Sequence, residues 1–430
     1  MEQIKVSRII KQNNVIIYDF QVSEGLKDFF SGKVFRVEYP ENIENVPDSI
    51  AVIPFVCNVL PIVWLTDSKL VLDEIDQAFY ECIPNVKNGY EAMFPESHFG
   101  GELIVLHVTK CDKDADEKCA AFYSGGVDSM QTLLSHVAEK PALISVWGSD
   151  VSYDNKEGWE LVKQVIQEAA QEYFLPEVTI KSTFRAFDRE DILDQAFCEQ
   201  LKDGWWHGIK HGIGLLGHVA PYAYLHGLST MYIASSNCPA DGEVRCASHP
   251  SIDNKVRFAE CQIVHDGFQF NRQEKIRNIV KYNKTSGKEK ILHLHVCWET
   301  QTGDNCCICE KCYRTMVGLL AEQADPMDYG FKYFPSTIKN IKKIVLYSGK
   351  MNENLSLQWI PISERVIENV GVLRKTEYWK EIRWLTKTDF KNIEKIHEPF
   401  VYRIEKKIRR SKCYCFAKRV RRKLKRCGKN

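Results

Sequence analysis

From Ala120 onward the sequence alternates between short apolar runs and longer amphipathic segments, and this alternation limits the possible folds more than any other feature. The apolar runs read as strands, whereas the segments between them carry apolar residues at helical spacing. The predicted strands are Ala120–Tyr123, Ala142–Trp147, Val178–Ile180 and Met231–Ser235, and the predicted helices are Met130–Ala138, Trp159–Tyr173 and Ile213–Ala220. Strands that alternate with helices predict an α/β fold, in which an open parallel sheet carries helices on both faces.

The chain of 430 residues is long enough for two or three domains. Residues 1–117 read as short strands and turns with one helix over Asp73–Ala78 and beyond, which predicts a smaller N-terminal α+β domain. The polar segment Lys110–Lys118 is a natural linker to a second domain, residues 118–325, that contains the parallel sheet. Residues 326–430 form a C-terminal extension, in which Phe334–Val345 and Thr376–Leu385 are candidate helices.

The most apolar run of the chain is Ile50–Leu65, which contains Pro54, Asn58 and Pro61. It falls short of a membrane span, and the prolines favour a buried strand-turn-strand. The N-terminus lacks the continuous apolar segment of a secretory signal peptide, so we expect a cytoplasmic protein. In a reducing compartment the sixteen cysteines would stay as thiols, either buried or bound to metal.

The last residues form a separate electrostatic segment. Between Arg403 and Asn430 there are fourteen Lys or Arg side chains and one acid, Glu405, so this basic tail carries +13 and residues 1–402 carry −12. Apolar residues within the tail recur on one helical face, which suits an anionic membrane surface, an acidic partner or the acidic body of the protein itself. A solvated helix without a partner fits the pattern equally well.

The hexapeptide Ser124-Gly125-Gly126-Val127-Asp128-Ser129 lies between a predicted strand and a predicted helix, where an open parallel sheet places its ligand site. Two adjacent glycines let the backbone approach an anion, and the following helix presents unpaired N–H groups to phosphate. Ser124 and Ser129 add hydroxyl donors, while the anionic Asp128 suits Mg²⁺ better than phosphate. A tight turn followed by a helix cap is the structural alternative.

The hexapeptide resembles the signature of the PP-loop ATP pyrophosphatases, also called the adenine nucleotide alpha-hydrolase-like superfamily. These enzymes cleave ATP between the α and β phosphates and transfer AMP to a substrate oxygen, and a nucleophile such as ammonia then displaces AMP. The resemblance implies a Rossmann-like PP-loop domain in which Ser124, Gly125, Gly126, Asp128 and Ser129 hold the pyrophosphate and its metal. No Gly-Lys-Ser/Thr follows the glycines, so this is not the lysine-bearing loop of kinases and GTPases.

Four cysteines, Cys297, Cys306, Cys309 and Cys312, lie within sixteen residues. Four thiolates at this spacing form the ligand set of a closed tetrahedral Zn²⁺ site, which has a structural role because no coordination position is open. Buried cysteines and a redox Cys-x-x-Cys are the alternatives. Cys307 sits beside Cys306 but closer to Cys309 than a usual ligand pair.

The run from Cys297 to Arg314 also resembles the zinc knuckle of 7-cyano-7-deazaguanine synthase, a branch of the same superfamily that converts a carboxylate into a nitrile with ATP and ammonia. The two motifs occur in the same order, and the resemblance covers roughly residues 118–325. Residues 237–257, where the synthases recognise their substrate, do not match them. The resemblance therefore implies the chemistry of the branch and not its deazaguanine substrate.

Further candidates follow the other predicted strands. Ser235 and Asn237 come directly after a strand and should emerge beside the phosphate loop, although a turn or helix cap accounts for them equally well. Asp150 follows another strand and is a candidate ribose contact. Arg272 and Lys275 lie near the start of a predicted helix and are candidate contacts for nucleotide or substrate.

Several histidines and cysteines have metal-like spacing without completing a known pattern. His207 and His211 are four residues apart on a predicted helix, but no third ligand is apparent, and His211 is a candidate phosphate or substrate contact. A second metal site could be built from Cys238, Cys246, His249 and Cys261. A satisfied histidine pair and buried cysteines are the simpler interpretations.

The sequence thus predicts an ATP-dependent ligase or amidotransferase that forms AMP and pyrophosphate, with ATP, Mg²⁺ and Zn²⁺ as cofactors and Asp128 and Ser129 as the catalytic residues. Its expected partners are a small-molecule substrate activated at a carboxylate or carbonyl oxygen and a donor of ammonia or amide nitrogen. Binding to nucleic acid is not expected, and a homodimer is left open. Sulfur transfer of the tRNA-thiolase type and a non-catalytic nucleotide-binding module are the competing hypotheses.

Overall fold

The computed structural model describes residues 2–111, 116–242, 244–288, 290–297, 299–300, 304–332, 340–347 and 352–395. The chain divides into two compact units, Met1–Cys306 with Ala324–Phe331 and Cys307–Gln323 with Lys332–Asn430. The boundary predicted at residue 117 falls within the first unit. The basic tail 403–430 and the first part of the predicted helix Phe334–Val345 lie outside the described residues.

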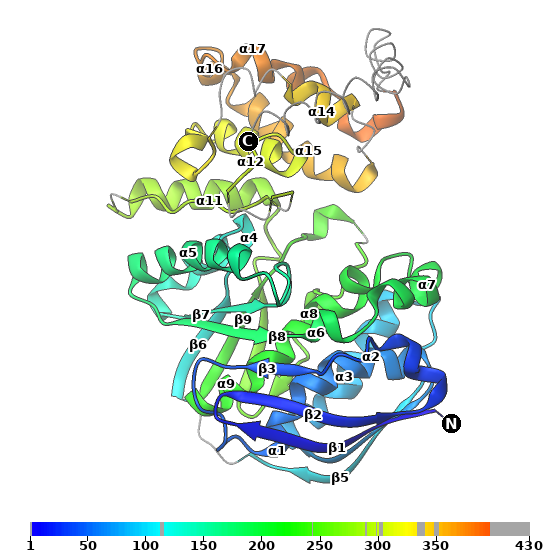
Figure 1. The fold of residues 1–430 in the computed structure, drawn as a ribbon. Helices are drawn as coiled ribbons and strands as arrows, with labels where there is room; N and C mark the ends of the chain where they lie inside the picture. Colours follow the sequence, from blue (N-terminus) through cyan, green and yellow to red (C-terminus); the bar gives the residue numbers. More distant parts are fainter. Residues whose placement is uncertain are drawn as a thin grey trace, which may run out of the picture. The chain divides into compact units, whose positions relative to one another are not determined.

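The first unit is built on one eleven-stranded sheet with the order β10-β11-β9-β6-β7-β8-β3-β2-β1-β4-β5 (Figure 1). Strands β11, β9, β6, β7 and β8 form a continuous parallel half. Their bounds are β6 Asp116–Phe122, β7 Ala142–Trp147, β8 Glu177–Ser182, β9 Leu228–Ala234, β10 Arg257–Phe258 and β11 Cys261–Asp266. The predicted α/β class with a large, mostly parallel sheet is confirmed.

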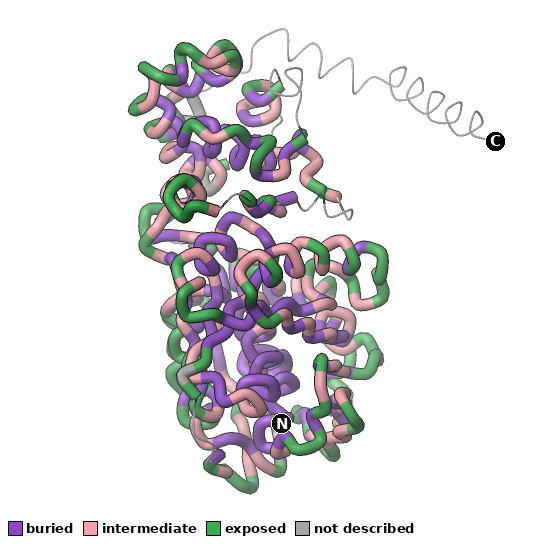
Figure 2. The backbone as a smooth tube through the Cα atoms, turned by 90° about the vertical axis from the view of Figure 1, so that its left-hand side faces the viewer, coloured by how far each residue is buried: buried purple, intermediate pink, exposed green. Residues whose placement is uncertain are grey.

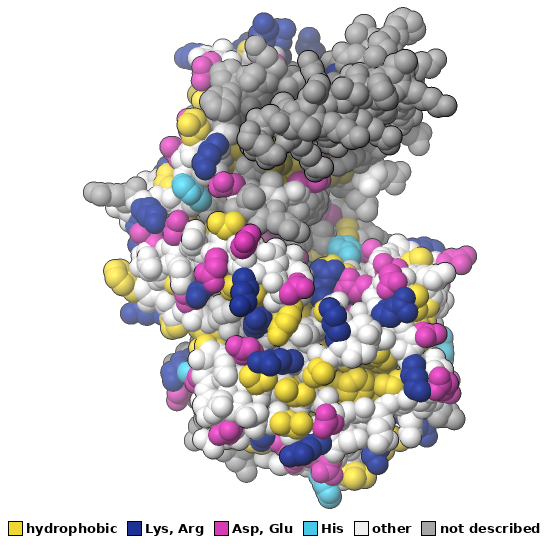
Figure 3. Space-filling view, viewed as in Figure 1, with side chains coloured by type: hydrophobic (Ala, Val, Ile, Leu, Met, Phe, Trp, Pro, Cys, Tyr) yellow, Lys and Arg dark blue, Asp and Glu magenta, His cyan; other side chains and the backbone are white. Residues whose placement is uncertain are grey.

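The N-terminal strands extend the same sheet. Their bounds are β1 Gln3–Gln12, β2 Val15–Val22, β3 Arg36–Glu38, β4 Lys69–Asp76 and β5 Glu102–Thr109. The join is antiparallel, because Val37 of β3 pairs with Ser182 of β8. Hydrophobic side chains gather on the outer face over β2 and β3 (Figure 3).

The run Ile50–Leu65 is helical, so the predicted strand-turn-strand is wrong. Helices α1 (Asp48–Ala51) and α2 (Ile53–Leu65) span it, and all residues of α2 except Leu65 are buried. A helix that is apolar on every side has no amphipathic period by which a sequence could reveal it. Within this run the Asn58 side-chain nitrogen donates to Pro54 O and Gly214 O.

The helix predicted over Asp73–Ala78 begins later. Residues up to Asp76 belong to β4, and α3 (Gln77–Met93) follows, with the Asp76 carboxylate capping it through the Phe79 N–H. The remaining α-helices of this unit are α4 Val127–His136, α5 Lys156–Tyr173, α6 Phe184–Phe187, α7 Glu190–Leu201, α8 His211–Leu216, α9 Ala220–His226, α10 Pro250–Asp253 and α11 Arg272–Thr285. The helices predicted over Met130–Ala138 and Trp159–Tyr173 correspond to α4 and α5.

Short helical turns complete the first unit: η1 Glu24–Phe29, η2 Val137–Glu139, η4 Gly217–Val219, η5 Pro239–Asp241, η6 Pro326–Tyr329 and a π-helical turn, η3, at Trp206–Lys210. Buried residues fill the interior of the unit (Figure 2). Among the described residues no helix has the length and apolar character needed to cross a membrane.

The regular elements in the described residues of the second unit are all helices. It contains α12 Glu310–Ala321, α14 Ile341–Tyr347, α15 Glu353–Glu368, α16 Val370–Leu373, α17 Trp379–Ile382, η7 Arg383–Lys387 and η8 Phe390–Lys395. Its core includes the ring cluster of Trp359, Trp384 and Phe390. Arg365 of α15 binds the Glu322 carboxylate at the end of α12 with two hydrogen bonds of 2.8 Å.

Candidate functional site

The hexapeptide Ser124–Ser129 connects β6 to α4 at the carboxyl edge of the parallel strands. From β6 the chain continues to β7 on one side and later returns to β9 on the other side, so this loop lies where the strand order reverses. Such a switch point is the usual ligand site of an open α/β sheet. Ser235 directly follows β9 and Asp266 ends β11, so both are at the same edge, as predicted for Ser235.

Gly125 and Gly126 have different roles in the loop. Gly125 has φ of +74°, a conformation that other residues rarely adopt, and its carbonyl accepts a 2.7 Å hydrogen bond from His295 N. Gly126 has φ of −70° and is the N-cap of α4, with no neighbour closer than 3.4 Å to a Cβ placed there. A Cβ at Gly126 would therefore make ordinary van der Waals contacts without overlap in front of the helix N-terminus.

The two serines fasten the loop to the first turn of α4. The Ser124 and Ser129 hydroxyls are 3.3 Å apart, and Ser129 Oγ also donates to Gly126 O at 3.3 Å. Ser124 N–H donates to Ser129 Oγ at 3.3 Å. These contacts fix the loop, and Ser129 itself is buried.

Asp128 lies in the first turn of α4 and pairs with two cations from the start of α11. Arg272 donates to Asp128 Oδ2 and Lys275 to Asp128 Oδ1, both at 3.1 Å. Lys275 Nζ also donates to the backbone carbonyl of Ser235. The Lys275 side chain is 2% exposed. Through these contacts the structure brings together Asp128, Ser235 and Lys275, three residues that sequence reasoning named separately.

A second polar cluster joins α4 to the end of β11 and consists of Asp266, Thr132 and His136. The Asp266 carboxylate accepts from Thr132 Oγ1 at 2.7 Å and contacts His136 Nε2 at 3.1 Å. The hydrogen bond with Asp266 raises the pKa of His136. Burial opposes ionisation of Asp266, but hydrogen bonds from His136 and Thr132 lower its pKa overall. Nothing in the sequence pattern marked His136, because its partner is distant in the chain.

The other predicted contacts are placed less closely. Ser235 Oγ donates to Asn237 O at 2.6 Å. This is a turn, the alternative to a ligand contact that the sequence left open for these two residues. Asp150 is exposed in the turn after β7. Among the described residues, the Ser235 and Asp150 side chains make no hydrogen bond with the Ser124–Ser129 loop.

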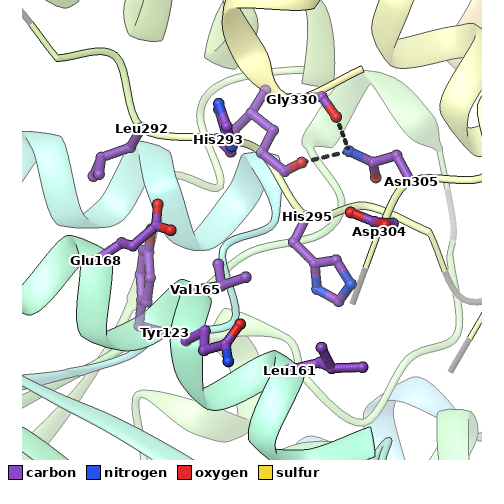
Figure 4. Close-up of a pocket in the computed structure, with 12 residues that line it drawn as sticks. Tyr123, Leu161, Val165, Glu168, Leu292, His293, His295, Asp304, Asn305 and Gly330 are labelled. Carbon is purple, nitrogen blue, oxygen red and sulfur yellow. Dashed lines mark hydrogen bonds between the residues drawn. The ribbon is translucent and has the colours of Figure 1, made fainter. Parts of the chain in front are cut away.

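A cavity of about 150 Å³ adjoins the loop (Figure 4). Leu161, Val165 and Glu168 of α5 line one side, and the extended segment from Leu292 to His295 lines the other. The Asn305 side chain holds that segment by donating to Leu294 O at 2.7 Å and accepting from Val296 N at 3.0 Å. No sequence motif identified these lining residues, which come from distant parts of the chain.

Cys297, Cys306, Cys309 and Cys312 form a candidate metal centre. Their sulfur atoms all lie within 4.8 Å of one another. Cys309 is also the N-cap of α12, and its sulfur accepts a hydrogen bond from Cys312 N at 3.4 Å. Four convergent thiols could hold a metal ion and are compatible with tetrahedral Zn²⁺, whereas the neighbouring Cys307 is not part of the group.

The second metal site considered from the sequence is not formed. Within the described ranges, no other set of His, Cys, Asp or Glu ligand atoms converges as the four cysteines do. Cys238, Cys246, His249 and Cys261 are therefore not a metal site here, since they belong to different local environments. Burial raises the pKa of Cys246, but interaction with His207 and His211 lowers it to about 6.

Searches against protein-family models, curated proteins and solved structures found no match. The site itself combines a glycine-rich turn at a helix N-terminus, a carboxylate paired with two cations and an adjoining cavity.

Proposed function

We propose that this chain is an ATP-dependent adenylating enzyme, in which Ser124–Ser129 holds the β and γ phosphates and leaves the α phosphorus open to attack. The observation that carries the proposal is the place of the loop, at the switch point of the parallel strands and at the N-terminus of α4. The order of its residues resembles the PP-loop ATP pyrophosphatases. The proposed family likeness is to the 7-cyano-7-deazaguanine synthase branch.

Backbone groups supply most of the proposed phosphate contacts. Because Gly126 has no side chain, an anion can approach the first N–H groups of α4, which carry the positive end of the helix dipole. Asp128, paired with Arg272 and Lys275, is the carboxylate suited to Mg²⁺. Mg²⁺, when bound there, would neutralise charge on the departing pyrophosphate. The cavity beside Gly125 is assigned to the nucleoside part of ATP.

The proposed reaction has two steps. A carboxylate or carbonyl oxygen of the small substrate attacks the α phosphorus, so that a P–O bond forms and pyrophosphate leaves. Ammonia or another nucleophile then attacks the activated carbon, and AMP leaves with that oxygen. The loop has no lysine in the position that stabilises γ-phosphoryl transfer, which is why AMP and not ADP is the expected product.

The four-cysteine centre is assigned a structural role in this proposal. Zn²⁺ bound by four thiolates has no free coordination position, so the metal stabilises the fold and does not activate substrate.

The test uses ATP labelled at the α phosphate, Mg²⁺ and the full chain, with chromatography of the nucleotide products. We expect ATP binding and slow formation of AMP, which Asp128→Asn reduces at least about tenfold. Asp73→Asn on the exposed face of β4 is the matched control and should leave both unchanged. ADP as the primary product would refute the proposal, and binding without any AMP would favour the non-catalytic nucleotide-binding module.

A further inference from the structure

The eleven-stranded sheet of the first unit has two edge strands, β10 and β5, and they differ in length. β10 consists of only Arg257–Phe258, whereas β5 runs over the eight residues Glu102–Thr109, at the lower edge of the view in Figure 1. β5 pairs in parallel with β4 on one side, and within the described residues no strand pairs with its other side. A long edge strand presents a row of backbone N–H and C=O groups to which another strand can add.

The sequence of β5 lacks the features that protect an edge strand. Natural sheets block their edges with prolines, bulges or charged side chains in the middle of the strand. β5 contains no proline, and its register with β4 has no bulge. Its charged residues are at the two ends, Glu102 as the first residue of the strand and Lys110 directly after the last. The middle of this edge is therefore open to a second strand.

The side chains of β5 divide between two faces. Leu103 and Val105 pack against the buried core of the unit, on the side where α2 and α3 contact β5. Because side chains alternate along a strand, Ile104, Leu106 and Val108 share the opposite face. Leu106 is 68% exposed and Val108 is 45% exposed. The outward face of this edge is thus a row of apolar side chains that solvent reaches.

The backbone of β5 directs alternate residues toward β4. Glu102 N donates to Ser68 O at 2.9 Å, so the hydrogen-bonding groups of Glu102 are on the β4 side. Even-numbered residues along the strand then bond to β4, and odd-numbered residues point their N–H and C=O groups toward the open edge. These odd-numbered residues are Leu103, Val105, His107 and Thr109. An added strand must bond to their backbone groups.

The outward face of β5 is complementary to itself in the antiparallel direction. Its order is acid, three apolar residues, base: Glu102, Ile104, Leu106, Val108 and Lys110. Two copies paired antiparallel about Leu106 would place each Glu102 opposite Lys110 of the other copy. Each Ile104 would lie opposite Val108, and the two Leu106 side chains would meet on the two-fold axis. This register also pairs odd-numbered residues with one another, so the open backbone groups face each other.

The neighbouring registers lose this match. An axis at Val105 would set Glu102 against Val108, and an axis at His107 would set Lys110 against Ile104. Both registers place a charge opposite an apolar side chain, whereas an axis at Leu106 places opposite charges together. Glu102 lies 3.5 Å from Lys69 of β4 and remains 61% exposed, so it can meet a second cation.

We propose that β5 is the interface of a homodimer, in which two copies of this chain join their edge strands antiparallel about Leu106. The sheet continues from one copy into the other through backbone hydrogen bonds. The same strand is used in both copies, so the assembly closes and the open edge is removed. The interface uses no ATP and no residue of Ser124–Ser129, so it does not depend on the proposed function.

The first experiment measures the molar mass of the full chain by sedimentation velocity over roughly 1–100 μM. We expect reversible dimerisation in this range, because pairing of one strand gives an interface at the small end of the known sizes. Leu106→Lys should weaken dimerisation at least about tenfold, since it sets two like charges opposite each other at the axis. Phe174→Lys, at an 88% exposed residue that ends α5, is the matched control and should leave the dimer unchanged.

Charge exchange tests the register. Glu102→Lys and Lys110→Glu should each weaken dimerisation roughly threefold, because like charges then face each other across the interface. The double variant Glu102→Lys/Lys110→Glu should restore it. Repulsion within one copy, between the new lysine and Lys69, persists in the double variant and cannot account for a restoration. Urea unfolding of each variant at low concentration shows that the monomers stay folded.

Cysteine substitution tests the same pairing without charges. Leu106→Cys brings the two new thiols together at the axis, so mild oxidation should link the copies, with the linked peptide identified by mass spectrometry. Val108→Cys is the matched control, because its two thiols would be four residues apart along the strands, about 14 Å, and should not link. Both substitutions are made in Cys198→Ser, which removes an exposed thiol on α7.

Three results would overturn the proposal. The first is a wild-type chain that stays monomeric up to roughly 100 μM. The second is a dimer that Leu106→Lys leaves intact, because the copies then join through another surface. The third is a dimer in which Val108→Cys links as readily as Leu106→Cys, because the strands then do not pair about Leu106. All three experiments are performed without ATP, so failure here and failure of adenylation are read separately.

Discussion

Replacing each glycine of the loop by alanine separates the folding requirement from the binding requirement. At Gly125 a Cβ would lie 2.5 Å from Val165 Cγ1, and φ is +74°. At Gly126 the nearest atom to a Cβ is Ser124 Oγ at 3.4 Å, and φ is −70°. The same chemical change therefore meets two opposite environments one residue apart.

The expected magnitudes follow from these geometries. Gly125→Ala costs about 1–2 kcal/mol for the left-handed backbone and about 1–3 kcal/mol for displacing the branched Val165 side chain. We expect a loss of roughly 2–5 kcal/mol in the free energy of unfolding. Gly126→Ala should cost only about 0.5–1 kcal/mol, because no overlap arises and alanine is merely a poorer N-cap than glycine.

For ATP binding, unlike stability, we expect a large effect from Gly126→Ala. The added methyl of Gly126→Ala occupies the space through which a phosphate would reach the N-terminus of α4, so ATP affinity should fall at least about tenfold in a fully folded protein. Urea unfolding and calorimetric titration with MgATP measure the two quantities on the same samples. Wild-type ATP affinity in Gly126→Ala would refute the placement of phosphate, and unchanged stability of Gly125→Ala would refute the loop geometry.

Three further predictions follow from other contacts. Cys309→Ser should reduce zinc, measured by elemental analysis, from about one per chain to near zero with a large fall in Tm, whereas Cys307→Ser should retain the metal. Asp128→Ala should cost about 3–5 kcal/mol of stability by removing the carboxylate from buried Lys275, and Asp128→Asn clearly less in the same urea titration. His136→Gln should lower stability more near pH 5.5 than near pH 8, because a raised histidine pKa stabilises below the unfolded value and is lost as pH rises through the folded one.

The position of the loop was predictable because two local signals agreed. Apolar Ala120–Phe122 specifies a buried strand, and the glycines followed by Val127 and Asp128 specify a turn into a helix. Parallel strands then bring their carboxyl ends to one edge, which is why Ser235 could be placed there as well. The convergence of Cys297, Cys306, Cys309 and Cys312 was also predictable, because the four ligands lie close together in the sequence.

Features that depend on distant pairing were not predictable. The continuation of the sheet rests on two residues of β3 that pair with β8, Val37 with Ser182 and Glu38 with Lys181, and no local pattern encodes this contact. The hydrogen bond from Ala247 N to His207 O likewise joins two segments that sequence reasoning assigned to separate candidate sites. In both cases the missing information was the partner and not the residue type.

The charges around the loop explain why Gly126 is the sharpest site to test. Arg272 and Lys275 bring two positive charges, but Asp128 takes both as partners, and Lys275 also lowers the pKa of the nearby Asp266. Two cations and two carboxylates leave the edge close to neutral, with protonated His136 adding one positive charge at lower pH. A neutral edge attracts a polyphosphate weakly over long range. In the proposed ATP complex, affinity would come from short-range contacts with backbone N–H groups and from a metal ion on Asp128, and we expect the methyl group of Gly126→Ala to weaken the first of these.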